Sequence, residues 1–245
     1  MSQLAYLLPW IAAVVIACGP TVDEVNRERG ARIEQVLRRA KAVGAAVARA
    51  PYPARPEPGT LHASLPLTQP ARSGNAAFIY AEDFEDFDEL GLVYARLPGG
   101  SLVSRCAAAA HTERRPWDPA SPATQPRAVF GNEAAQLYDA CERLHYLFVI
   151  RTDTFLRPGA PRPASTADTE RRRYDFDGGL VAGELLVYSL ASAELLGATR
   201  FQATSRESFP MLPSEAELES DLVGGVAAAL KEAAEKNLRG VTVIP

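Results

Sequence analysis

A long amphipathic helix is the first folded element that the pattern of apolar positions predicts. Apolar residues recur every three or four positions across residues 21–50, the spacing of one helix face. Thr21 and Glu24 form a capping-box pattern at the start, and Arg38, Arg39 and Lys41 fall on the opposite face. We therefore expect a packed helix whose apolar stripe is Ile33, Val36, Leu37, Ala40, Val43 and Val47.

A proline-rich segment follows at residues 51–75. It shows no periodic apolar pattern, and its prolines disfavour helix and favour extended polyproline II structure. The segment is predicted to be a linker or a strap across the surface. Its prolines are Pro51, Pro53, Pro56, Pro58, Pro66 and Pro70.

Residues 76–245 are predicted to form a single α+β domain. Strands are expected at residues 76–80, 90–97 and 102–109, and a short helix from Asn132, as its N-cap, to about Arg143. The run from Tyr146 to Ile150 is almost wholly apolar, as in a strand buried on both faces.

The C-terminal third is expected to contain a hairpin and a helix. Residues 180–190 and 195–204 read as two strands joined by a loop of about four residues. Ser214 and Glu217 form a second capping box, and Gly240 stands where a helix C-terminus is expected. The element order favours an α+β fold, a mainly antiparallel sheet with helices packed on one face.

The N-terminus differs in character from the rest of the chain. No charged residue occurs from Leu4 to Ala17, and the chain turns polar directly after Cys18. This apolar run is shorter than the roughly 20 residues that span a bilayer, so it favours a signal-peptide core at residues 1–17.

The residues Val15-Ile16-Ala17-Cys18 resemble the lipobox of bacterial lipoproteins. The resemblance covers only the first twenty residues and implies that Cys18 carries acyl chains such as palmitate and becomes the first residue of the mature protein. Residues 18–50 would then be the lipid anchor and N-terminal helix, and the proline-rich segment would supply reach between anchor and body. Gly19 resembles the residue that follows the cysteine in lipoproteins sorted to the outer membrane.

The cysteine count fits an exported protein. Of the three cysteines, assigning Cys18 to lipid leaves Cys106 and Cys141, which an oxidising compartment would allow to pair. The alternative is two separate buried thiols.

Composition and charge narrow the function further. With 26 Lys and Arg against 30 Asp and Glu, the net charge of -4 provides no basic field for nucleic acid. His62, His111 and His145 lack the spacing of metal ligands, so no metal site and no cofactor are predicted. The acidic run 82–89 fits a solvated turn better than a calcium loop.

The remaining candidates are weaker. Cys106 and His111 are near in sequence, but a disulfide would remove the nucleophile. Residues 171–173 are three arginines in an otherwise polar loop, and Trp117 is a candidate aromatic anchor for a partner.

The sequence therefore favours a noncatalytic envelope lipoprotein. Its body would bind a partner or take part in an assembly at the membrane that holds Cys18. Two alternatives stay open: an envelope enzyme or enzyme regulator with an unrecognised site, and a lipoprotein that binds a small molecule.

Overall fold

The structure is a computed structural model. It describes residues 20–55, 61–66, 74–84, 102–111, 131–159, 162–163, 174–175, 178–206, 208–209 and 213–244. The expected signal peptide, Cys18 and the strand expected at residues 90–97 lie outside the described residues.

The N-terminal helix is confirmed as α2 (Val22–Arg49). Thr21 is its N-cap, and the capping box with Glu24 is complete in both directions. The predicted apolar stripe is buried, and Val25 extends it to within one turn of the cap. The body of the protein therefore begins at α2.

A four-stranded sheet forms the centre of the molecule, in the order β2-β3-β6-β7. Its strands are β2 (Ala76–Tyr80), β3 (Tyr146–Leu156), β6 (Leu180–Ser189) and β7 (Leu195–Thr204). β3, β6 and β7 pair antiparallel, whereas β2 is parallel to β3. The α+β class, the strand at residues 76–80 and the C-terminal hairpin are thus confirmed.

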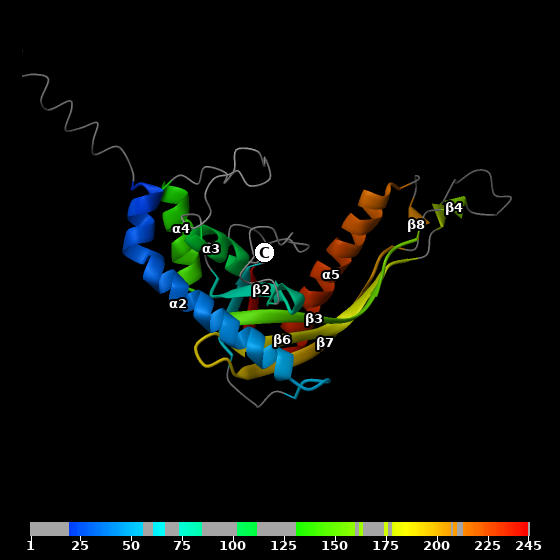
Figure 1. The fold of residues 1–245 in the computed structure, drawn as a ribbon. Helices are drawn as coiled ribbons and strands as arrows, with labels where there is room; N and C mark the ends of the chain where they lie inside the picture. The colour runs from blue at the N-terminus through cyan, green and yellow to red at the C-terminus, as the bar shows by residue number, and fades with distance from the viewer. Residues whose placement is uncertain are drawn as a thin grey trace, which may run out of the picture.

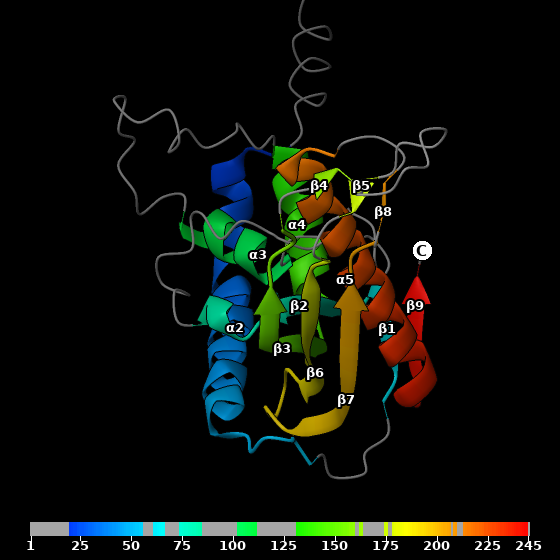
Figure 2. The same cartoon turned by 90° about the vertical axis from the view of Figure 1, so that its right-hand side faces the viewer.

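Helices cover both faces of this sheet, not one as the sequence suggested (Figures 1 and 2). On one face, α2, α3 (Leu102–His111) and α4 (Gly131–Glu142) pack over Leu147 and Val149. On the other, α5 (Glu215–Asn237) belongs to the same core as Phe148 and Ile150. Successive β3 residues point to opposite faces, so a continuous apolar run requires cover on both sides.

Two sequence-based assignments are wrong in detail. The strand expected at residues 102–109 is the helix α3, which suits its run of four alanines because alanine has the highest helix propensity. Asn132 lies inside α4 and is not its N-cap. The last helix does begin after Ser214, with a complete capping box to Glu217.

The proline-rich segment contains an unpredicted strand. β1 (Ala63–Pro66) pairs in parallel with β9 (Val241–Ile244), and Leu61, Ala63 and Leu65 are buried in the α5-side core. Gly240, with φ +81°, makes the turn into β9. Because α2 precedes this segment and already packs in the core, the segment is a strap within the body and supplies no reach between anchor and body.

Four short elements complete the description of these residues. A short 3-10 helix, η2 (Glu82–Phe84), packs against α2 through Phe84 at Gly44. A small sheet of β4 (Arg162–Pro163), β5 (Tyr174–Asp175) and β8 (Ser208–Phe209) lies at the same end of the molecule as the N-terminus of α5. The N-termini of α2 and α4 lie at that end as well, and the β6–β7 turn at the other (Figure 2).

Candidate functional site

The two cysteines expected to pair form a disulfide. Cys106 of α3 and Cys141 of α4 are both fully buried, with their Cα atoms 6.1 Å apart. The bond ties two helices together in the core under α2. Because Cys106 is bonded, it has no thiol that His111, the last residue of α3, could activate as a nucleophile.

The histidines do not converge. His62 and His145 are exposed, one before β1 and the other before β3. Within the described residues, no group of His, Cys, Asp or Glu side chains is arranged to hold a metal ion. Of the acidic run, only residues 82–84 are described, and they form η2. Trp117 and residues 171–173 lie outside the described part.

A polar cluster that the sequence did not reveal lies where α2 ends on the sheet. Its centre is Glu184 of β6, which is only 2% exposed. Glu184 forms an ion pair with Arg151, its neighbour across the β3–β6 pairing, and accepts a hydrogen bond of 3.0 Å from the backbone N–H of Ala54. Arg151 also donates to the carbonyl oxygens of Ala50 and Pro51, at 3.0 and 2.8 Å. The buried ion pair thus fastens the segment after α2 to the sheet.

Tyr52 forms the outer layer of this cluster. The guanidinium carbons of Arg151 and Arg200 lie 5.3 and 5.6 Å from the centre of its ring, within cation–π range. Its hydroxyl donates to Asp153, which also forms a 3.2 Å ion pair with Arg200. The hydrogen bond between Tyr52 and Asp153 raises the pKa of the phenol and lowers that of the carboxyl group.

Two buried polar atoms near this cluster lack a hydrogen bond in the described structure: Nε of Arg151 and the hydroxyl of Tyr188. Burial raises the pKa of Tyr188. The charged groups of the cluster pair with one another, Glu184 with Arg151 and Asp153 with Arg200. This arrangement is that of a structural clamp. The signal in the sequence was a single carboxylate, Glu184, inside an otherwise apolar strand, because such residues are seldom buried without a partner.

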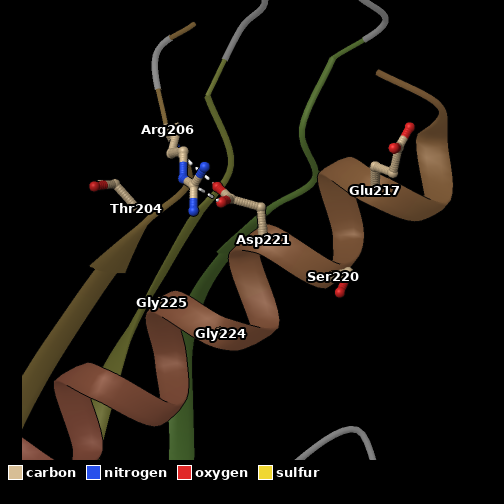
Figure 3. Close-up of a pocket in the computed structure, with 7 residues that line it drawn as sticks. All are labelled: Thr204, Arg206, Glu217, Ser220, Asp221, Gly224 and Gly225. Atoms are coloured by element: carbon tan, nitrogen blue, oxygen red, sulfur yellow. Dashed lines mark hydrogen bonds and ion pairs between the residues drawn. The ribbon is translucent and has the colours of Figure 1, made fainter. Parts of the chain in front are cut away.

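A surface hollow of about 540 Å³ lies between the end of β7 and the first half of α5 (Figure 3). Arg206 and Asp221 meet across it, with a 2.9 Å ion pair and a 2.7 Å hydrogen bond from the Arg206 backbone N–H. Gly225 lets the helix approach β7, since a Cβ there would be 3.1 Å from the Thr204 carbonyl oxygen. The hollow is lined by Thr204, Arg206, Glu217, Ser220, Asp221, Gly224 and Gly225.

None of the helices in the described part of the chain combines the length and the apolar character needed to cross a bilayer. Comparison with known proteins gives no match, whether to a protein family, to a curated protein or to a solved structure.

Proposed function

We propose that the chain is an exported bacterial lipoprotein, tethered to the cell envelope by acyl chains on Cys18, and that its α+β body is a noncatalytic binding or assembly component. The observation that carries this proposal is the partition of the three cysteines. Cys106 and Cys141 pair in the core, and disulfides persist in oxidising compartments outside the cytoplasm. The remaining cysteine stands where the apolar leader ends, in a lipobox-like sequence.

The polar groups that the fold assembles support a noncatalytic role. Glu184 and Arg151 bond to each other and to the segment after α2, and Arg206 bonds to Asp221. These contacts hold elements of the fold together. Gly19 after the acylated cysteine favours the outer membrane as the location.

Metabolic labelling with radioactive palmitate tests the anchor. The wild type is expected to incorporate label, and Cys18→Ala is expected to incorporate none. The matched control is the double variant Cys106→Ala/Cys141→Ala, which loses two cysteines but keeps Cys18. It should carry as much label per molecule of recovered protein as the wild type. Equal labelling of wild type and Cys18→Ala would contradict the proposal.

The binding or assembly role has its own test. After mild detergent extraction of the native envelope, chemical crosslinking should shift the lipoprotein into one larger complex of fixed composition. Recovery only as the single chain, with crosslinker efficiency shown on a known envelope complex, would contradict the role while leaving the anchor intact.

The hollow beside α5 supports a second candidate, a lipoprotein that binds a small molecule, because ligand sites are commonly concave surfaces of some 300–1,000 Å³. Native mass spectrometry of the protein from its own envelope should then detect a bound small molecule. Gly224 lines the hollow and has open space beside it, so Gly224→Trp should fill the hollow and lose the molecule, whereas Ser192→Trp in the β6–β7 turn should keep it. If the wild type shows only the mass of the lipoprotein itself, with no bound molecule, this candidate is refuted.

A further inference from the structure

The outer face of α2 carries a concentration of positive charge. Between residues 35 and 55 the sequence has five basic residues and no acidic one. All five are exposed, four of them on α2, and we call the set the basic face: Arg38, Arg39, Lys41, Arg49 and Arg55. The apolar stripe of α2 is in the core, so the four basic side chains on α2 point away from the sheet.

Acidic groups flank this face. Glu34 lies one turn before it and is 3.8 Å from Arg38. η2, with Glu82 and Asp83, packs at Gly44 through Phe84, on the half-buried side of the helix. Among the described residues, the outward surface of the last four turns of α2 therefore carries more basic than acidic side chains, although the whole chain is negative.

The position of Cys18 relative to α2 gives this charge a partner. Only Gly19 and Pro20 separate Cys18 from Thr21, the N-cap, and Val25 is already in the core. Three residues span at most about 11 Å. A lipid on Cys18 would thus hold the start of α2 at the bilayer surface, with no long tether between them.

We propose that α2 lies along the membrane with its basic face on anionic lipid headgroups, so that the acyl chains and the basic face together form a two-part membrane contact. The inference rests on the proposed acylation of Cys18. A basic surface next to a lipid anchor strengthens membrane attachment because each basic residue near an anionic surface adds to the affinity. The sheet and α5 then face away from the membrane.

The alternative orientation is upright, with the end of the molecule at which α2, α4 and α5 begin resting on the membrane. α2 slants away from that end (Figure 1), and at about 1.5 Å per residue Ala42, on its exposed side, is roughly 30 Å along the helix from the N-cap. The first turn of α5, which includes exposed Ala216, lies at the same end of the molecule as the start of α2 (Figures 1 and 2). Labels at these two alanines therefore respond oppositely to the two orientations.

The experiment uses the full acylated chain in vesicles that carry a headgroup-linked quencher. A fluorophore is placed on Ala42→Cys or on Ala216→Cys, and vesicles with phosphatidylglycerol are compared with vesicles of phosphatidylcholine alone. Cys106 and Cys141 are bonded to each other, so the added cysteine is the only free thiol once Cys18 is acylated. Labelling of the chain without an added cysteine would reveal an unacylated Cys18, which is a failure of the proposed function and not of the orientation.

We expect strong quenching at residue 42 and weak quenching at residue 216 on phosphatidylglycerol vesicles. The variant Arg38→Gln/Arg39→Gln/Arg49→Gln should lose the quenching at residue 42. At roughly fivefold per basic residue near the surface, its ratio of lying to upright molecules should fall about 100-fold.

A matched control removes three exposed basic residues elsewhere, in the variant Arg157→Gln/Lys236→Gln/Arg239→Gln, and should keep the quenching. Quenching at residue 216 and not at residue 42 would overturn the inference in favour of the upright orientation. Quenching at residue 42 that is unchanged in the triple variant would overturn the electrostatic contact. No quenching at either residue, on vesicles that retain the protein, would mean that the basic face serves an acidic partner instead.

Discussion

The ion pair between Glu184 and Arg151 allows a quantitative test of how the segment after α2 is held. Replacing Glu184 with alanine leaves the Arg151 guanidinium, whose side chain is 19% exposed, without its carboxylate partner. It also leaves the backbone N–H of Ala54 without an acceptor. Removing one member of a buried pair costs about 3–5 kcal/mol. Arg151 keeps two carbonyl acceptors, at Ala50 and Pro51, so we expect the lower end, about 3 kcal/mol.

Removing both charges should behave differently. A buried ion pair replaced by apolar residues of similar size is often neutral in stability, because neither charge remains unpaired. The double variant Glu184→Leu/Arg151→Met leaves only backbone groups of Ala50, Pro51 and Ala54 without their side-chain partners. It should therefore be less stable than the wild type by only about 1–2 kcal/mol. The single variants Glu184→Leu and Arg151→Met should each lose about 3 kcal/mol of stability, which gives a coupling energy of several kcal/mol in the double-mutant cycle.

Urea unfolding followed by far-ultraviolet circular dichroism measures these differences. The comparison is valid where the slope of the unfolding free energy against urea concentration is the same in all variants. Glu232→Ala serves as the control, since Glu232 pairs with Lys236 in water on the surface of α5 and its loss should leave stability unaltered. A cost for Glu184→Ala equal to that of the control would refute the clamp. So would a double variant whose loss equals the sum of the two single losses.

Three further predictions concern the core and the turns. The double variant Cys106→Ala/Cys141→Ala should lose about 4 kcal/mol of stability, the chain-entropy value for a 35-residue separation, measured by urea unfolding without reductant; an unchanged midpoint would show that the bond does not constrain the unfolded chain. Hydrogen bonds from the N-cap of α5 lower the pKa of Glu217, so its contribution to stability is present above its unfolded pKa and is lost as the pH falls through the lower folded value. Glu217→Gln should accordingly flatten the dependence of thermal stability on pH below about 5, and a parallel curve would contradict this assignment. Gly240→Ala should lower the free energy of unfolding by at least about 2 kcal/mol, because φ is +81° and a Cβ would lie 1.9 Å from a backbone carbonyl oxygen. Gly224→Ala, where a Cβ has open space around it, should be neutral or stabilising. Thermal unfolding measures both.

The elements that were predictable from the sequence are those whose signals are local. Thr21 and Ser214 cap α2 and α5 through residues three positions away, and the β6–β7 hairpin joins neighbouring strands. The α+β class follows from the order of these elements. The apolar run of β3 indicated burial on both faces, although only one helical layer was expected.

The parts that were missed depend on contacts between distant residues. β1 and β9 are each only four residues long and pair the strap after α2 with the C-terminal strand, so neither carries a strong pattern of its own. The clamp brings Ala54 to Glu184 across 130 residues, and no spacing in the sequence indicates that distance. The outward charge of α2 is visible in the sequence, but its relation to Cys18 is not, because the prolines of residues 51–75 predict a spacer between anchor and body whereas α2 already belongs to the body.

The direct entry of α2 into the core also has a mechanical consequence. Val25 is buried four residues after Thr21, and α2 then stays in contact with α3, α4 and the sheet. Force applied to the chain ahead of Thr21 therefore reaches the interior within four residues, because Val25 is already part of the core. Unfolding under a force applied at that point must begin by separating α2 from α3, α4 and the sheet.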